Sequence, residues 1–229
     1  GRNEKNWNRL LREEIAKKLK RDNEIDAKPE EIIVTCGSKE AILLSVLALV
    51  NPREEVIVPD PGYVAYRPIV ELIDGVSKSL PLREDDDFEV HPETLKKSIT
   101  RKTKLIIINT PSNPTGTVLS KKVLEEIADI AVEKNLMIMS DEAYEKLIYD
   151  NSKHVSIGSF NGMEDRVVTI QSFSKTYAMC GFRVGYAVGN EDLIREMKEF
   201  KICTTLSAPT FAQLAAVEAL KNSSNYVKM

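Results

Sequence analysis

Apolar residues along the chain alternate between short continuous runs and longer segments with helical spacing. Continuous apolar or β-branched runs are typical of strands that are buried on both faces, and they occur at 31–35, 55–58, 105–109, 136–139, 167–171 and 184–188. The more polar segment 76–82 is a further strand candidate. Apolar residues three and four positions apart predict helices at 7–21, 38–50, 92–99 and 120–134, and a long helix that begins at 191.

Strands that alternate with helices predict an α/β fold in which helices cover both faces of one sheet. No internal repeat or low-complexity linker divides the 229 residues, which suit one large domain or two small ones. In such sheets ligands bind beyond the carboxyl ends of the strands. Polar and glycine-rich residues follow four of the predicted strands, at Gly37-Ser38, Asn113, Asp141 and 172–175. The pattern therefore predicts one site built from several loops.

Composition excludes several classes of protein. The net charge is -3 and no basic block is present, which argues against a nucleic-acid partner. The longest apolar stretch, 41–50, is interrupted by Ser45 and is too short to span a bilayer, and no secretory signal opens the chain. Three widely spaced cysteines indicate a reducing compartment without disulfides, and two histidines leave little material for a metal site. We therefore expect a cytoplasmic chain with no metal and no membrane partner.

The turn Gly37-Ser38-Lys39 joins a predicted strand to a predicted helix. Glycine permits a tight backbone there, and the N–H groups of Ser38 and Lys39 would open the helix and face an anion. An ordinary helix cap is the commoner explanation for such a turn taken by itself.

Two further segments carry charged side chains between apolar strands. Asp141, in SDEAY at 140–144, stands directly after a strand, where it would act as a helix cap, a metal ligand or the partner of a cationic ring nitrogen. Lys175 lies among Ser, Thr and Tyr, and a lysine near a phosphate is able to act as an amine nucleophile. Arg183, eight residues after Lys175, would bind the same anion through two parallel hydrogen bonds from its guanidinium. A surface lysine and a salt-bridged arginine are the simpler alternative for this segment alone.

Three motifs occur in order, each after a buried strand: PSNPTG at 111–116, SDEAY at 140–144 and SFSKTYAMCGFRVG at 172–185. In this order the chain resembles the fold-type-I, class I/II aminotransferases, from about Leu11 to its end, and most closely the subgroup of aspartate and aromatic-amino-acid aminotransferases. The resemblance implies pyridoxal 5'-phosphate as cofactor and a three-layer sandwich with a mostly parallel seven-stranded sheet. It also implies that residues 1–229 are the cofactor-binding large domain, without the family's N-terminal segment and C-terminal small domain.

The resemblance assigns a role to each matching residue. Lys175 would hold the cofactor as a Schiff base and carry the α-proton, and Asp141 would pair with the protonated pyridine nitrogen. Tyr144 and Asn113 would bind the phenolate oxygen, and Tyr63, otherwise a core tyrosine, would stack on the ring. Lys175, Asp141 and Tyr144 are the expected catalytic residues. The expected phosphate cup consists of Gly37, Ser38, Lys39, Ser172, Ser174 and Arg183.

Three neighbours of these motifs are assigned no chemistry. Tyr66 and Tyr177 are interpreted as core residues, and Cys180 as filler because no histidine is near it in sequence.

The implied activity is transfer of an amino group between an amino acid and a 2-oxo acid, by a homodimer. The arginine that grips the substrate carboxylate in the family is absent from this chain, and 1–4 contain no tyrosine to reach a neighbouring subunit's phosphate. One alternative is therefore a cofactor-binding core with little or no activity. Another fold-type-I activity, a lyase or decarboxylase, shares the same core residues, and a non-catalytic cofactor-binding module is disfavoured by the absence of a basic face. The sequence does not predict which amino acid is used.

Overall fold

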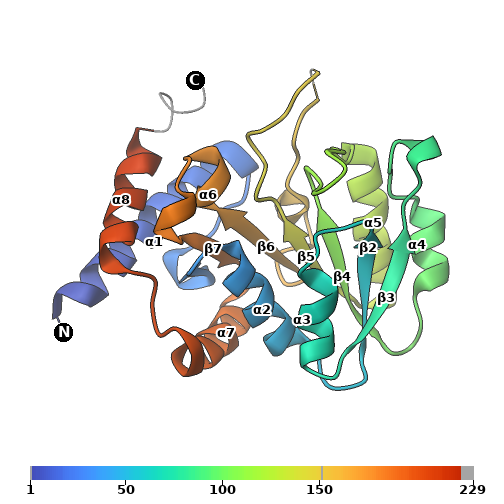
Figure 1. Ribbon diagram of the computed structural model, residues 1–229, viewed down its shortest axis with the longest axis horizontal. Coiled ribbons are helices and arrows are strands. Elements are labelled where there is room, and N and C mark those ends of the chain that lie inside the picture. Colours follow the sequence, from blue (N-terminus) through green and yellow to red (C-terminus); the bar gives the residue numbers. More distant parts are fainter. Residues whose placement is uncertain (1, 151, 223–229) are drawn as a thin grey trace.

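The computed structural model describes residues 2–150 and 152–222 and contains one seven-stranded sheet (Figure 1). Its strands lie in the order β1-β7-β6-β5-β4-β2-β3. The strands are β1 (Ile32–Thr35), β2 (Glu55–Asp60), β3 (Val76–Pro81), β4 (Thr103–Asn109), β5 (Met137–Asp141), β6 (Val167–Ser172) and β7 (Gly185–Val188).

Only β7 runs against its neighbours, β1 and β6, and the other paired strands are parallel. The expected mostly parallel sheet of seven strands is therefore confirmed, and each predicted strand is present within a few residues of its expected ends.

The helices are α1 (Arg2–Asn23), α2 (Ser38–Leu49), α3 (Tyr66–Leu72), α4 (Pro92–Ser98), α5 (Lys121–Lys134), α6 (Phe173–Thr176), α7 (Glu191–Thr204) and α8 (Thr210–Lys221). Short 3-10 turns lie at Pro29–Glu31, Glu84–Asp86, Ile157–Ser159 and Cys180–Phe182.

The long helix expected to begin at 191 is present as α7, and a second helix, α8, which the pattern did not predict, follows it. The α7 helix ends at Thr204, Leu206 takes a left-handed φ of 62°, and Pro209 precedes α8. A left-handed residue and a proline both interrupt a helix. The α8 helix then packs beside α1, although the two lie at opposite ends of the sequence (Figure 1).

Side-chain caps fix the ends of α5 and α7. The Ser120 hydroxyl accepts the Val123 N–H at 3.3 Å, and the Asn190 carboxamide oxygen accepts the Leu193 N–H at 2.8 Å. Such caps satisfy N–H groups that the first turn of a helix leaves without an internal partner. At the other end of α5, Asn135 closes the helix with a left-handed φ of 53°.

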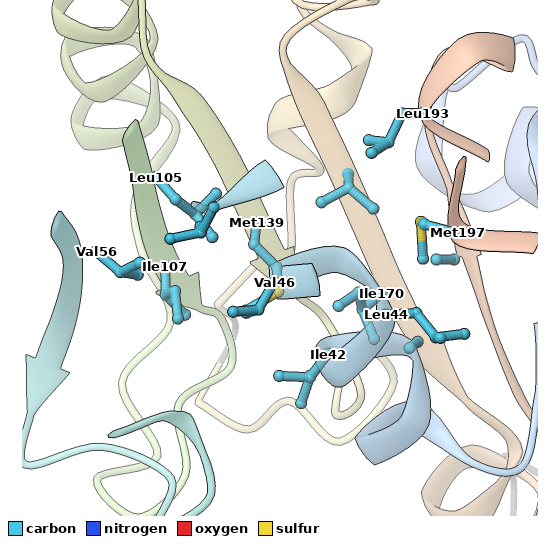
Figure 2. Close-up of a cluster of buried hydrophobic side chains, with 14 of the residues drawn as sticks. Ile42, Leu44, Val46, Val56, Leu105, Ile107, Met139, Ile170, Leu193 and Met197 are labelled. Carbon is cyan, nitrogen blue, oxygen red and sulfur yellow. The ribbon is translucent and has the colours of Figure 1, made fainter. Parts of the chain in front are cut away.

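Each central strand sends alternate side chains to opposite faces of the sheet, and both faces are buried. In β4, Leu105 and Ile107 belong to the core under α2, α3 and α7 (Figure 2), whereas Ile106 and Ile108 belong to the core under α4 and α5. Beyond β6, α1 and α8 cover that second face over β7 and β1. Two covered faces explain why the strands read as continuous apolar runs.

None of the helices within 2–150 and 152–222 is long and apolar enough to cross a membrane. The expectations about Gly1 and about the chain's end at Met229 concern positions outside the described residues.

Candidate active site

Four strands bring polar residues to one edge of the sheet. Asn109 and Asp141 are register partners at the carboxyl ends of β4 and β5. Ser172, at the end of β6, pairs with Gly185 of β7, which in turn pairs with Thr35 at the end of β1. The four loops that the sequence pointed to therefore meet at this edge, as parallel strands require.

A cavity of about 390 Å³ opens at this edge, and we call it the strand-end cavity. Its walls include ten of the eleven residues expected to bind the cofactor, all except Gly37. Its lining residues are Ser38, Lys39, Tyr63, Asn109, Asn113, Asp141, Ala143, Tyr144, Ser172, Ser174, Lys175, Cys180 and Arg183.

Gly37 lies directly behind the wall, where a side chain does not fit. Its φ is +84°, and a Cβ on it would lie 2.4 Å from Nη2 of Arg183. Nη2 of Arg183 donates to the Cys36 carbonyl at 3.4 Å, and Nη1 donates to the Cys180 carbonyl at 3.0 Å. Arg183 is thus held against the turn that begins α2 because residue 37 has no side chain.

A buried ion pair fixes the same turn from the other side. The Glu40 carboxylate accepts the Cys36 N–H at 2.6 Å and the Lys201 ammonium at 2.7 Å. Burial alone would raise the pKa of Glu40, but the hydrogen bonds from Lys201, Thr205 and Cys36 hold it below its ordinary value. The backbone geometry of the turn therefore depends on a fixed charge pair rather than on loop packing alone.

The start of α2 and its surroundings form a site suited to an anion. The first N–H groups of a helix have no internal partner and carry partial positive charge. The side chains of Lys39, Lys175 and Arg183 add positive charge to the same cavity. The Ser172 hydroxyl accepts the Ser174 N–H at 3.1 Å, which orders the serine-rich turn that opens α6 beside them.

Asp141 is the buried acid of the cavity, with 5% of its surface exposed. Its Oδ2 accepts the Tyr66 hydroxyl at 2.8 Å, and its Oδ1 accepts the Ala143 N–H at 3.2 Å. Burial raises the pKa of Asp141 to about 6, although these two hydrogen bonds act in the opposite direction. Among the described residues Asp141 has no ion-pair partner, so its negative charge still lacks a cation.

The two lysines of the cavity face aromatic rings. Lys175 Nζ lies 5.4 Å from the centroid of the Tyr144 ring, and Lys39 Nζ lies 5.8 Å from that of Tyr63. Both distances are within the range of cation–π attraction. Although Lys175 is an exposed residue, its amine lies beside the Tyr144 ring at the wall of the cavity, within reach of a ligand bound there.

Sequence reasoning missed Asn109. Its carboxamide donates to the Asp141 carbonyl at 2.9 Å and accepts the Asn113 N–H at 2.7 Å, so it ties the PSNPTG loop to the end of β5. The available signal was its place as the polar last residue of an apolar strand.

Tyr66 is fully buried, as expected of a core residue, but its hydroxyl contacts Asp141, which the core interpretation did not include. Tyr177 packs on Phe173 with ring centroids 5.2 Å apart, in keeping with its core assignment. Cys180 is exposed and lines the cavity, and its thiol donates to the Ser174 carbonyl at 3.0 Å, so it is a wall residue rather than filler.

Glu142 and Glu145, which follow Asp141 in the sequence, belong to a buried cluster of hydrogen-bonded polar side chains that we call the Glu142–Glu145 network. Glu142 is fully buried and accepts the Ser156 hydroxyl at 2.6 Å and a hydrogen bond from Gln171 at 3.2 Å, and His154 Nε2 lies 3.0 Å from it. Glu145 pairs with the Lys18 ammonium of α1. The members of the network are Lys18, Asn23, Glu142, Glu145, His154, Ser156 and Gln171.

Glu142 and Glu145, which directly follow Asp141 and Tyr144, anchor this segment of the chain to the network. Glu142, Glu145 and His154 present ligand atoms within 4.8 Å of one another, but the Lys18 ammonium already supplies the positive charge there. A larger cavity of about 510 Å³ lies nearby between the end of α1 and α5, and none of the expected cofactor-binding residues lines it.

The residues of the strand-end cavity fit pyridoxal 5'-phosphate. The phosphate requires N–H donors and cations, which the start of α2 and Arg183 supply beside a glycine cradle. The cationic ring nitrogen requires a buried anion, which Asp141 supplies, and the aldehyde requires an amine, which Lys175 supplies.

Comparison with known proteins gives a consistent result. The family model described as aminotransferase class I and II matches residues 7–229. The aspartate aminotransferase of Pyrococcus abyssi is 45% identical over 94% of this chain and 56% of its own length. The aromatic-amino-acid aminotransferase 2 of Thermococcus litoralis is 43% identical over the same shares.

Solved structures agree with these relatives. The aromatic aminotransferase of Pyrococcus horikoshii superposes with a TM-score of 0.94 at 44% identity, over 96% of this chain and 60% of that one. The chain thus spans a little over half the length of the relatives it matches. On the family match, the fold and the order of its motifs, the chain belongs to the class I and II aminotransferases.

Proposed function

We propose that this chain binds pyridoxal 5'-phosphate through Lys175 and forms the catalytic core of an aminotransferase that exchanges an amino group between an amino acid and a 2-oxo acid. Pyridoxal phosphate is the cofactor of the family to which the chain belongs. The observation that carries the proposal is the convergence of Lys175, Asp141 and Arg183 on one cavity beside the start of α2.

Each wall of the strand-end cavity has its own task in this proposal. The N–H groups of Ser38 and Lys39, the side chain of Arg183, and the hydroxyls of Ser172 and Ser174 bind the phosphate. Because Gly37 has no side chain, the Arg183 guanidinium lies against the turn that begins α2, where we propose that the phosphate binds.

The ring is held from three sides. Tyr63 would stack on its face, Asn113 and Tyr144 would donate hydrogen bonds to its phenolate oxygen, and Asp141 would accept a hydrogen bond from its protonated nitrogen. When bound, pyridoxal phosphate supplies an electron sink that stabilises negative charge at the substrate's α-carbon. Asp141 preserves that property by keeping the ring nitrogen protonated, and Lys175 Nζ accepts and returns the α-proton.

The relatives' names guide the substrate class. They are aspartate and aromatic-amino-acid aminotransferases, so we propose an amino acid of one of these classes as amino donor. A cytoplasmic homodimer belongs to the same proposal, as does the assignment of residues 1–229 to the cofactor-binding large domain.

The first experiment asks which lysine holds the cofactor. Pyridoxal phosphate added to the purified chain is expected to give a visible absorption band, and borohydride should then fix the cofactor on the peptide that contains Lys175. Lys175→Ala should abolish the fixed adduct. Lys39→Ala is the matched control, because Lys39 lines the same cavity and should leave the adduct in place. An adduct of equal yield in Lys175→Ala would overturn the assignment.

Amino transfer is tested separately on the complete parent protein. We expect transfer that depends on a 2-oxo acid acceptor. Release of ammonia or carbon dioxide without an acceptor would instead indicate a lyase or a decarboxylase, which share the core residues.

A further inference from the structure

Tyr66 lies behind the wall of the strand-end cavity and contacts its buried acid. It is the first residue of α3, has no exposed surface, and donates its hydroxyl to Asp141 Oδ2 at 2.8 Å. Its ring packs edge-on against Tyr63, with centroids 5.5 Å apart and planes 80° apart. Tyr63 lines the cavity and Tyr66 does not, so Tyr66 acts on the site only through these two neighbours.

The two oxygens of Asp141 are held by different donors. Oδ2 accepts the Tyr66 hydroxyl and Oδ1 accepts the Ala143 N–H at 3.2 Å, so the plane of the carboxylate is fixed from both sides. An ionised carboxylate has about four lone-pair positions, and two donors leave room for another. The remaining capacity is what a protonated ring nitrogen in the cavity would use.

The donor from Tyr66 is permanent. Burial, together with the nearby Asp141 charge, raises the pKa of Tyr66 well above its ordinary value, so the phenol keeps its proton. A phenol held neutral beside a buried carboxylate stabilises the charged form of that carboxylate.

No other described side chain performs this task for Asp141, and the second donor to its carboxylate is the backbone N–H of Ala143. Burial raises the pKa of Asp141, and the adjacent acid Glu142 raises it further. The charged and titratable groups that share the cavity with Asp141 are Lys39, Tyr63, Tyr144, Lys175, Cys180 and Arg183. None of these is hydrogen-bonded to the Asp141 carboxylate, whereas Tyr66 is.

We propose that Tyr66 is a positioning residue, whose hydroxyl orients the Asp141 carboxylate and keeps it ionised for the cationic ring nitrogen of the cofactor. The part that concerns the cofactor rests on the proposed function. The effect of Tyr66 on the titration of Asp141 does not, because it is a property of the chain alone.

The test compares Tyr66→Phe with Tyr186→Phe. Tyr186 is an equally buried tyrosine on β7, and its ring packs on Phe173, so the control removes the same oxygen away from Asp141. Carbon-13 NMR of labelled carboxyl groups follows Asp141 in the cofactor-free chain, with Asp141→Asn to assign the signal. In Tyr66→Phe we expect its midpoint to rise by about one pH unit, which is tenfold tighter proton binding. In Tyr186→Phe the midpoint should stay where it is in the unaltered chain.

A second readout uses pyridoxal phosphate. Tyr66→Phe should bind it about twofold more weakly at pH 7, and the defect relative to the unaltered chain should shrink at pH 9, where Asp141 is ionised in both. If the unaltered chain fails to bind pyridoxal phosphate, the proposed function fails. If it binds, and Tyr66→Phe matches it in both affinity and Asp141 midpoint, only the role of Tyr66 fails.

A measurement on the unaltered chain covers the case in which Tyr66→Phe does not fold. The ring carbon that bears the hydroxyl of Tyr66, labelled with carbon-13, should shift with the same midpoint as Asp141. A Tyr66 signal that does not respond to the Asp141 titration would overturn the proposal.

Discussion

Two buried carboxylates only four positions apart behave in opposite ways. Glu145 lies in the Glu142–Glu145 network, where the Lys18 ammonium and hydrogen bonds from Asn23 and Gln171 meet it. Burial would raise the pKa of Glu145, but Lys18 and Asn23 hold it below its ordinary value. Asp141 lies in the strand-end cavity, where its carboxylate accepts two hydrogen bonds and pairs with none of the described cations, and burial raises its pKa to about 6.

The difference separates a structural region from a binding region. In the network the chain supplies both the Glu145 carboxylate and the Lys18 ammonium that pairs with it, so the charge of Glu145 is balanced when the protein folds. In the cavity none of the described cations pairs with Asp141, although Lys39, Lys175 and Arg183 line the same cavity, so we expect its positive partner to arrive with a ligand. A buried acid without a cation partner in the chain is typical of a functional site. The free-energy cost of burying its charge is offset only when a cationic ligand binds. The predictions below test this contrast.

Removing the Lys18 ammonium, the cation that pairs with Glu145, should change the free energy of unfolding most. Lys18→Met leaves the buried Glu145 charge without its partner, and loss of one member of a buried pair costs about 3–5 kcal/mol. Urea unfolding of the cofactor-free chain measures this loss. Lys20→Met, on the same helix, removes an exposed pair with Asp26 and should cost less than about 1 kcal/mol. Equal losses in the two variants would show that the network is not the structural region described above.

Removing the unpaired charge of Asp141 should increase the stability of the chain, which is opposite to the effect of removing Lys18. The pKa of Asp141 is raised from 3.8 to about 6 in the folded chain, so folding binds a proton between these values and stability falls as the pH rises through them. Since each pKa unit corresponds to about 1.4 kcal/mol, the cost at pH 7 reaches up to about 3 kcal/mol. Asp141→Asn should therefore stabilise the cofactor-free chain at pH 7 by up to that amount, and not at pH 3.

Urea unfolding at the two pH values measures the effect of Asp141→Asn. Asp192→Asn is the control, because that side chain is 79% exposed and its replacement should change stability by less than about 0.5 kcal/mol. A stabilisation that is the same at pH 3 and pH 7 would contradict the charge argument.

The smallest change in stability is expected at Gly37. Gly37→Ala places a Cβ 2.4 Å from the Arg183 guanidinium and strains a φ of +84°, and we expect a loss of about 1 kcal/mol from the backbone strain. Gly116→Ala is the matched control, because φ there is +78° and nothing lies within 4 Å of the added Cβ.

Cofactor binding separates these two glycines. Both variants should lose similar stability, but only Gly37→Ala displaces Arg183 and should weaken pyridoxal phosphate binding by about tenfold, which corresponds to about 1.4 kcal/mol. A binding titration followed by absorbance measures it. Unchanged affinity in Gly37→Ala would mean that the cradle beside Arg183 does not serve a phosphate.

Sequence patterns predicted the sheet well because its central strands are buried on both faces and so appear as nearly unbroken apolar runs, whereas the edge strand β3 is more polar and largely exposed. They did not predict α3 or the division between α7 and α8. The α3 helix is only seven residues long, and the break at Leu206 depends on a left-handed backbone that no residue type signalled.

The family resemblance that rests on the order of three motifs was sufficient to name ten of the residues that line the cavity. It was not sufficient for Tyr66, whose hydroxyl reaches Asp141 from 75 positions away, or for Lys18, which reaches Glu145 from 127 away. Such contacts are set by the packing of α3 and α1 on the sheet, and spacing along the chain carries no trace of them.

The central claim is that Asp141 is a buried anion whose cation arrives with the cofactor. Carbon-13 NMR of the Asp141 carboxyl group, recorded across pH with and without pyridoxal phosphate, tests it most directly. The account predicts a midpoint near 6 in the free chain, falling by at least two pH units in the loaded one. A midpoint that pyridoxal phosphate leaves unchanged, with the cofactor fixed on Lys175, would contradict it.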